Sequence, residues 1–385
     1  MKILSLLLCL FLLTGCASPH AAATEPVPES THAPTQTQPP ETTIATTVPT
    51  EAPDPIGDRI AQMSLEERVG QLFLARCSAP TAIPDIRQYH LGGFLLFGVD
   101  IRDETPDSLR AKLESYQGAA NTPLLIAVDE EGGTVTRVSR YPSFRETNFA
   151  SPRELYSWGA MEWVLAVEEE KCDLLGSLGI NVNLGPVCDI STDPAAFMYQ
   201  RSLGLDAYGT ADFVSQTVGI MNSHQIGSAL KHFPGYGNNT DTHTGIAVDM
   251  RSLDELEGTD LIPFLAGIQA DCGSIMVSHT IVTCMDPELP ASLSPIVHDY
   301  IRDEMGFGGV IVTDDLVMQA ITDQYGAGEA AVLAVLAGND LLCSSEYAVQ
   351  YEAVLAAVLE GRIDIDTLNR AVRNVLQWKQ ALGLL

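Results

Sequence analysis

The sequence predicts an α/β fold of one domain, a (β/α)8 TIM-type barrel. Three observations support this prediction: eight short apolar runs recur along the chain, helical patterns lie between most of them, and polar residues directly follow several of them. Strands that are apolar throughout and alternate with helices are typical of a parallel sheet covered by helices on its faces. Eight such units fit a closed barrel better than an open sheet.

The first residues have the pattern of an export signal. Lys2 precedes an apolar run at residues 3–13, which has the length of a signal core and is too short to span a bilayer. The sequence LTGC at residues 13–16 resembles a bacterial lipobox, which implies cleavage before Cys16 and lipidation of its thiol. We therefore expect a signal peptide at residues 1–15 and a lipid anchor that holds the protein on the extracytoplasmic face of the cell membrane. The alternative is an ordinary signal peptide with an incidental cysteine.

Residues 16–54 are expected to form a disordered tether. They consist largely of Thr, Pro, Ala and Glu, with almost no large apolar side chain, so burial cannot offset the entropy cost of ordering them. Their prolines keep such a segment extended. The folded domain is expected at residues 55–385, and Ser64 with Glu67 has the capping-box pattern that starts a helix.

Composition excludes one class of partner. The formal net charge is −29, whereas nucleic-acid binding requires a clustered cationic surface, so we expect no nucleic-acid partner. Two of the eight cysteines, Cys9 and Cys16, belong to the leader. The other six are scattered without the close pairs of a metal or redox motif, and we expect mostly free thiols: Cys77, Cys172, Cys188, Cys272, Cys284 and Cys343.

The expected elements follow one another in regular order. The eight apolar runs that we expect to be strands are residues 71–75, 93–97, 124–128, 181–184, 228–231, 274–277, 309–312 and 340–343. The helical patterns include residues 163–178, 211–224, 253–269 and 329–336. The final segment, 364–385, has the pattern of an amphipathic helix that seals the barrel.

Polar residues lie at the carboxyl ends of four expected strands. They are Asp129, Lys231 with His232, Ser278 with His279, and Asp314. A TIM barrel builds its active site at this end, from residues that several strands contribute. The sequence therefore predicts one functional site there.

The first candidate cluster is the sequence DEEGG at residues 129–133, followed by Arg137. Two glycines after acidic residues indicate a tight turn that a ligand can approach closely. The Asp129 carboxylate could accept hydrogen bonds from hydroxyl groups of a sugar, and Arg137 could donate them. The alternative is an acidic, solvated turn.

The second cluster runs from residue 229 to 243. Lys231 and His232 are costly to bury without polar partners, and a glycine-rich loop follows them. Asp241 stands two residues before His243; a carboxylate that binds one imidazole nitrogen fixes the tautomer, so the other nitrogen can exchange a proton near neutral pH. The spacing does not favour zinc, because no further His or Cys pair completes a ligand set. We expect neither a metal nor a cofactor.

The third cluster is an apolar strand that ends in two adjacent carboxylates, Asp314 and Asp315. Neighbours on an extended chain face opposite ways, so at most one of them should point into the barrel mouth. We favour Asp314, which could attack an anomeric carbon and form a covalent intermediate. The alternative role is a helix cap, which Asp315 could fill while Asp314 carries the chemistry.

Taken together, these clusters resemble glycoside hydrolase family 3, and within it the β-N-acetylhexosaminidase branch, over residues 56–385. The matching motifs are DEEGG at 129–133, NLGPVCD at 183–189, RSLG at 201–204, KHFPGYG at 231–237, DTH at 241–243, PASLS at 290–294 and TDDL at 313–316. Two positions depart from the family pattern, which commonly has Gln at Glu130 and His at Tyr236. We expect these departures to affect substrate preference rather than mechanism.

The resemblance implies a single catalytic barrel that hydrolyses terminal β-linked N-acetylglucosamine from oligosaccharides or from cell-wall fragments during peptidoglycan turnover. It implies retention of configuration through a covalent glycosyl intermediate on Asp314. It also implies that His243, oriented by Asp241, is the acid/base, in place of the second domain that supplies this group in the glucosidase branch. The residues expected to hold the sugar are Asp129, Arg137, Arg201, Lys231 and His232.

Two other functions remain open at this point. Phosphorolysis of the same bond is possible, because a histidine acid/base, unlike a carboxylate, does not repel phosphate. A sugar-binding lipoprotein without catalysis would also carry the lipobox and the tether. The expected partners are a carbohydrate substrate and a membrane, and we expect a monomer.

Overall fold

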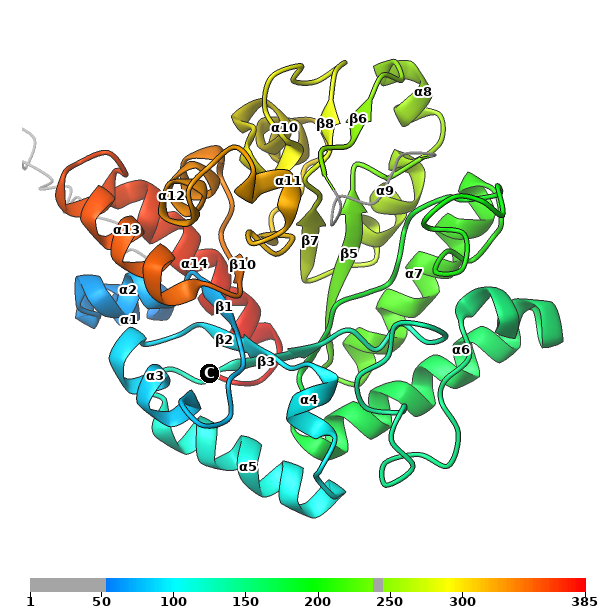
Figure 1. Ribbon diagram of the computed structural model, residues 1–385, viewed down its shortest axis with the longest axis horizontal. Helices are drawn as coiled ribbons and strands as arrows, with labels where there is room; N and C mark the ends of the chain where they lie inside the picture. Colours follow the sequence, from blue (N-terminus) through cyan, green and yellow to red (C-terminus); the bar gives the residue numbers. More distant parts are fainter. Residues whose placement is uncertain (1–52, 238–244) are drawn as a thin grey trace, which may run out of the picture. The chain divides into compact units, whose positions relative to one another are not determined.

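Eight parallel strands form the centre of the structure (Figure 1). The computed structural model describes residues 53–237 and 245–385. The barrel strands are β1 (Phe73–Arg76), β2 (Gly93–Leu95), β3 (Leu125–Val128), β4 (Val182–Asn183), β5 (Gly227–Phe233), β7 (Ser274–Val277), β9 (Val310–Thr313) and β10 (Leu342–Ser344). Each of the eight apolar runs in the sequence contributes one of these strands. The predicted (β/α)8 TIM-type barrel is therefore confirmed.

The strands follow the order of the chain around the ring. Every neighbouring pair is parallel, and β10 pairs with β1, with Phe73 opposite Leu342. A parallel bridge between Val312 and Leu341 joins the two ends of the sheet, and the Thr313 amide donates to the Leu341 carbonyl over 3.1 Å. Closing the ring in this way leaves the described barrel strands without an exposed edge.

Helices surround the barrel and connect its strands (Figure 1). The α-helices before β4 are α1 (Pro55–Gln62), α2 (Leu65–Gly70), α3 (Ala82–Tyr89), α4 (Gly98–Ile101), α5 (Pro106–Ala119) and α6 (Pro152–Leu178). Those after β4 are α7 (Ala207–Ser223), α8 (Leu253–Glu257), α9 (Leu261–Gln269), α10 (Pro295–Asp299), α11 (Gln319–Thr322), α12 (Ala327–Ala337), α13 (Tyr347–Leu359) and α14 (Ile365–Ala381). Two short helices of other types are η2 (Ala291–Leu293) and η3 (Tyr300–Glu304).

The observed helices agree in most places with those that the sequence predicts. Ser64 caps α2, since its hydroxyl accepts from the Glu67 amide over 3.1 Å and the Glu67 carboxylate accepts from the Ser64 amide over 2.9 Å. The segment predicted as one helix at 253–269 is instead two, α8 and α9, because the helix stops at Gly258. None of the helices within the described ranges is long and apolar enough to cross a membrane.

A second sheet lies beside the carboxyl ends of β5 and β7 and was not predicted. Its strands, β6 (Val248–Asp249) and β8 (Ile281–Val282), pair in parallel and come from the segments that follow those two barrel strands. In Figure 1 this sheet lies above β5 and β7. It extends the protein at the end of the barrel where the polar residues gather.

Helix α14 closes the opposite end of the barrel. Its Trp378 packs with side chains of the barrel interior, among them Leu125, Met276 and Val310. The strands make room for the indole: a Cβ atom on Gly227 would lie 2.8 Å from the ring, and one on Gly273 only 2.1 Å. The structure thus agrees with the amphipathic sealing helix expected at 364–385.

The described cysteines are all free thiols. Five of them are buried, and Cys284 is exposed. Burial raises the pKa of the Cys343 thiol well above its usual range, and the nearby Asp315 and Asp314 raise it further. These thiols act as small apolar side chains in the packing.

Candidate active site

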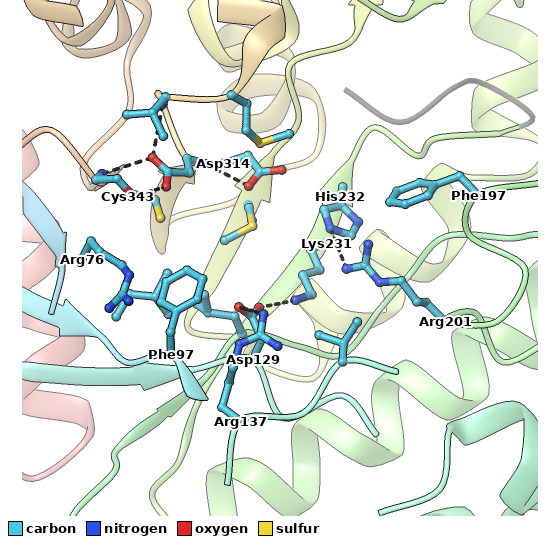
Figure 2. Close-up of a pocket in the computed structure, with 18 of the residues that line it drawn as sticks. Arg76, Phe97, Asp129, Arg137, Phe197, Arg201, Lys231, His232, Asp314 and Cys343 are labelled. Carbon is cyan, nitrogen blue, oxygen red and sulfur yellow. Dashed lines mark hydrogen bonds and ion pairs between the residues drawn. The ribbon is translucent and has the colours of Figure 1, made fainter. Parts of the chain in front are cut away.

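A cavity of about 990 Å³ opens at the carboxyl end of the barrel. Side chains from the ends of several strands line it, as Figure 2 shows for Arg76, Phe97, Asp129, Lys231, Asp314 and Cys343. The residues that the sequence predicts to hold a sugar all line this cavity together with Asp314: Asp129, Arg137, Arg201, Lys231 and His232. Asp241 and His243 lie outside the described residues. The described chain before them ends at Gly237, directly after Tyr236, which lines the cavity.

Lys231 is the central cation of the site. It is only 1% exposed, and its ammonium lies 2.8 Å from Asp129 Oδ1 and 2.6 Å from Glu131 Oε1. Burial alone would lower the pKa of Lys231, but these two carboxylates outweigh it, and the pKa is raised. The polar partners that a buried lysine requires are therefore supplied by the turn after β3.

Glu131 joins Lys231 to Arg201. The Arg201 guanidinium binds the Glu131 carboxylate through two nitrogens, at 2.9 and 2.7 Å. Burial opposes ionisation of Glu131, but Arg201 and Lys231 outweigh it and hold the pKa of this carboxyl well below its usual range. Glu131 was not predicted as a site residue; its only signal in the sequence is its place in the acidic motif after a strand.

His232 is fixed in one tautomer by its two neighbours. Its Nδ1 lies 2.8 Å from Asp189 Oδ2, and its Nε2 lies 3.3 Å from Arg201 Nη2. An ionised carboxylate only accepts hydrogen bonds and a guanidinium only donates them, so the proton stands on Nδ1 and Nε2 is the acceptor. Asp189 also accepts from the backbone amides of His232 and Tyr236, at 3.1 and 2.7 Å. Asp189 ends the NLGPVCD motif at 183–189, but this function was not predicted for it.

Strand β5 is irregular where Lys231 and His232 stand. Its pairing with β7 shifts register between Leu230 and Phe233. In a regular strand two consecutive side chains would face opposite ways, whereas both Lys231 and His232 line the cavity.

Asp314 and Asp315 both line the cavity, so the prediction that only one would face it was wrong. The Asp314 amide still continues the β-ladder by donating to the Val277 carbonyl over 3.0 Å, but the chain then turns instead of staying extended. Asp314 Oδ1 accepts from the Asp315 amide over 2.8 Å.

Asp315 stabilises this turn. Its carboxylate accepts from the Val317 amide at 3.2 Å and from the Ser345 hydroxyl at 2.6 Å. It does not cap a helix, since α11 begins at Gln319. Burial, with a contribution from the neighbouring Asp314, raises the pKa of Asp315. Asp314 is therefore the better candidate for chemistry, because Asp315 is committed to the turn.

The turn after β3 is held by Glu130. Its side chain is completely buried and accepts from the Arg137, Val138 and Ser139 amides at 2.8, 2.7 and 3.2 Å, and from the Ser139 hydroxyl. All four groups donate, so a carboxylate suits the position where the related pattern commonly has Gln. This turn carries Asp129 and Arg137 into the cavity.

Arg76 and Arg137 both contact the ring of Phe97 (Figure 2). The Arg76 guanidinium lies 4.1 Å from the ring centroid and that of Arg137 lies 5.3 Å from it. Arg137 also approaches Asp129 Oδ2, at 3.5 Å. Arg76 and Phe97 were missed by the sequence analysis, because neither stands in a polar motif.

Tyr236 forms part of the cavity wall. It is 1% exposed, and its ring meets His232 and Phe197 edge to face, with centroid distances of 5.2 and 5.6 Å. The departure from the related pattern at this position thus lies directly against a residue expected to hold the sugar.

The other two polar residues at strand ends, Ser278 and His279, lie in buried surroundings. His279 is buried, with Nδ1 2.7 Å from the Ser292 hydroxyl and Nε2 3.0 Å from the Asp315 carbonyl. Ser278 is likewise buried. Within residues 53–237 and 245–385, no group of three or more His, Cys, Asp or Glu side chains is arranged to hold a metal ion.

Comparisons with known proteins agree with this geometry. Residues 64–378 match the model of the glycosyl hydrolase family 3 N-terminal domain. The chain is 37% identical to a beta-hexosaminidase from Stenotrophomonas maltophilia over 269 residues, which cover 65% of this chain and 77% of the relative. It is 29% identical to beta-hexosaminidase LpqI from Mycobacterium tuberculosis over 352 residues, covering 88% of this chain and 89% of LpqI.

Solved structures show the same similarity. A family 3 β-N-acetylglucosaminidase from Paenibacillus superposes with a TM-score of 0.79 at 32% identity, covering 84% of this chain but less than two thirds, 63%, of that one. The structure of LpqI from Mycobacterium tuberculosis superposes with a TM-score of 0.77 at 27% identity, covering 85% of this chain and 96% of LpqI. The family model and the fold agree over nearly the whole described barrel, and the chain belongs to glycosyl hydrolase family 3.

Proposed function

We propose that this protein is a β-N-acetylhexosaminidase that hydrolyses terminal β-linked N-acetylglucosamine from oligosaccharides or cell-wall fragments. One observation carries the proposal most directly: Asp314 stands at the end of β9 in a cavity that also contains Asp129, Arg201, Lys231 and His232. The names of the relatives support the substrate class, since they include beta-hexosaminidases and a β-N-acetylglucosaminidase.

The proposed reaction retains the configuration of the sugar. The Asp314 carboxylate attacks the anomeric carbon while the leaving oxygen takes a proton from His243, and the glycosyl group becomes an ester of Asp314. His243 then removes a proton from water, which displaces Asp314 from the anomeric carbon. Asp241 orients His243 through the second imidazole nitrogen in this scheme. Both residues of this dyad lie outside the described part of the chain and are assigned from their motif.

The sugar-holding groups offer a matched set of donors and acceptors. Asp129 can accept from hydroxyl groups, and Lys231, Arg201 and Arg137 can donate to them. Buried charges that are already paired are held in place before the substrate arrives, which lowers the entropy cost of binding.

The first experiment tests the nucleophile. We expect Asp314→Asn and Asp314→Gly to reduce release of p-nitrophenol from p-nitrophenyl N-acetyl-β-glucosaminide by at least about 10³-fold. Azide should partly restore turnover in Asp314→Gly and give a glycosyl azide of inverted configuration. Asp323→Asn, an exposed aspartate in the same connection, is the matched control and should retain full activity. Unreduced activity in Asp314→Asn would remove Asp314 from this role.

The second experiment separates hydrolysis from the two alternatives. Rates are measured with and without inorganic phosphate, and the products are analysed for sugar 1-phosphate. Hydrolysis predicts free N-acetylglucosamine at a rate independent of phosphate. A phosphate-dependent rate would favour phosphorolysis, and absence of turnover on every aryl glycoside would favour a sugar-binding lipoprotein.

We further propose that residues 1–15 are a lipoprotein signal peptide, that Cys16 carries the lipid, and that residues 16–54 tether the barrel of residues 55–385 outside the cell membrane. The lipobox pattern and the Thr/Pro-rich composition support this proposal. The full chain expressed in a bacterial host should enter the detergent phase on phase partition, whereas Cys16→Ala should remain in the aqueous phase. Aqueous partition of the unchanged protein would contradict the anchor.

A further inference from the structure

We infer that a second glycan-contact site continues from the catalytic cavity onto helix α6 and binds the part of the sugar chain beyond the terminal residue. The inference rests on the proposed function, because the chain it binds belongs to the same substrate. Its parts are a small polar recess beside the cavity and two exposed tryptophans, Trp158 and Trp163.

The recess is continuous with the catalytic cavity. It has a volume of about 310 Å³ and shares two lining residues, Thr134 and Gln200, with the larger cavity. Its far side is formed by the start of α6, at Ser151 and Glu154, with Asn148 nearby. Glu154 is the one ionisable side chain among the described lining residues, and it is engaged by the Ser151 amide at 2.9 Å. Amide, hydroxyl and backbone groups of this kind suit an uncharged ligand rich in hydroxyls.

Trp158 lies one helical turn beyond Glu154. Residues four apart on a helix share a face, so the indole follows the recess along the same side of α6. Trp158 is 60% exposed and Trp163 is 54% exposed, whereas Trp378, the remaining tryptophan of the chain, is 7% exposed. Large aromatic side chains usually contribute to cores, and two exposed ones on the helix that borders a polar recess indicate a binding site.

A break in α6 lies between the two tryptophans. Gly159 and Ala160 leave the helical conformation, and Ala160 adopts a φ of 56°, which is unfavourable for a residue with a Cβ atom. In an unbroken helix, residues five apart would point about 140° away from each other. Here the Trp163 ring lies against Gly159, the residue after Trp158, where a Cβ atom would be 2.0 Å from Trp163 Cδ1. Backbone strain of this kind is concentrated at functional sites.

Arg153 connects the start of α6 to the cavity wall. Its guanidinium donates to the Tyr199 carbonyl at 2.7 Å, to the Ser191 carbonyl at 2.6 Å and to the Ser202 hydroxyl at 2.9 Å. The segment that it binds also carries Arg201, which lines the catalytic cavity. The start of α6, which leads into Trp158, therefore has a defined position relative to the proposed site of cleavage.

The chemistry of the recess and the two indoles favours a neutral sugar chain. The flat face of an indole carries negative charge density and attracts the C–H groups on the apolar face of a pyranose ring. The net charge of −29 does not favour an anionic ligand at a recess whose one described ionisable lining residue, Glu154, is acidic. A β-linked chain of N-acetylglucosamine meets both conditions, with its terminal residue in the cavity and its following residues on the recess and the indoles.

The test compares a short and a long substrate. Trp158→Ala, Trp163→Ala and the double variant are assayed on p-nitrophenyl N-acetyl-β-glucosaminide and on the β-1,4-linked hexamer of N-acetylglucosamine. We expect unchanged kcat/KM on the aryl glycoside, and a KM for the hexamer that rises about fivefold for each indole removed. Trp158→Phe should retain most of the affinity. Leu359→Ala, which removes a 71% exposed side chain from α13 on the other side of the barrel, is the control (Figure 1).

A binding measurement distinguishes failure of the proposed function from failure of the second glycan-contact site. Because Trp378 is buried, a change of intrinsic fluorescence on titration with the hexamer reports mainly on Trp158 and Trp163. If no substrate is hydrolysed but the hexamer still binds through the indoles, the proposed function fails and the site stands. If calorimetric titration shows that the hexamer binds the double variant with unchanged Kd, or if the variants lose activity equally on both substrates, the inference is overturned while the proposed function stands. Unchanged melting temperatures confirm that the variants remain folded.

Discussion

Lys231 and Glu131 form an ion pair of 2.6 Å, with side chains that are only 2% and 3% exposed. They come from different strands of the barrel: Lys231 from β5 and Glu131 from the turn after β3, with β4 between them. The pair therefore exists only when these three strands are assembled. It links the stability of the barrel to the positions of Lys231 and Arg201, the cations that we propose hold the sugar.

Glu131→Gln should destabilise the protein and weaken substrate binding. The substitution leaves Lys231 and Arg201 with one buried carboxylate fewer, and breaking a buried pair typically costs about 3–5 kcal/mol, less where a hydrogen-bonding amide replaces the charge. We expect a loss of about 2–3 kcal/mol in urea unfolding and a KM raised about tenfold. Glu168→Gln removes a comparable buried partner, that of Lys171, outside the cavity and should lower stability without changing KM. An unchanged KM in Glu131→Gln would contradict the role given to this residue.

Acid should destabilise the protein through the same carboxylate. The folded pKa of Glu131 lies well below its ordinary value of 4.5, so the folded state binds fewer protons than the unfolded state in this range. Its contribution to stability is full above about pH 4.5 and is lost as the pH falls towards the folded pKa. Urea unfolding between pH 6 and 3 should show a shallower decline for Glu131→Gln than for the unchanged protein. Parallel curves would show that Glu131 is not the responsible group.

Asp189 should act as a positioning residue for His232. Asp189→Asn places an amide where Nδ1 of His232 now donates, and the amide can donate in turn, so the tautomer is no longer fixed. We expect a KM about tenfold higher with a smaller change in kcat. In ¹⁵N NMR spectra the His232 ring should show one tautomer in the unchanged protein and a mixture in the variant. A single unchanged tautomer in Asp189→Asn would contradict this prediction.

Tyr236 should contribute through its ring. Tyr236→Phe keeps the edge-to-face contacts with His232 and Phe197 and should retain stability to within about 1 kcal/mol. Tyr236→Ala leaves a cavity beside them and should cost about 3–5 kcal/mol. Tyr236→His restores the residue common in related sequences and should alter the ratio of kcat/KM between aryl N-acetylglucosaminide and N-acetylgalactosaminide more than it alters stability. Thermal melts and a panel of aryl glycosides check these outcomes.

The arrangement of the barrel could be predicted because its signals are local. Each strand, such as β7 or β9, is a short apolar run bounded by polar residues, and the helices between them show their own period. The same local reading placed Asp129, Lys231, His232 and Asp314 at strand ends, and all of them line the cavity. The break between α8 and α9 and the pair of β6 with β8 were missed, since short elements depend on packing more than on periodicity.

The fold and the residue types that gather at one end of it could be inferred from local sequence patterns, because a parallel barrel brings the carboxyl ends of all its strands together. How those residues pair could be learned only from the folded molecule. Glu131 with Lys231, Asp189 with His232, and the turn that exposes both Asp314 and Asp315 depend on contacts between strands far apart in the chain. The energies of such buried pairs come from their distances and surroundings, which no local pattern records.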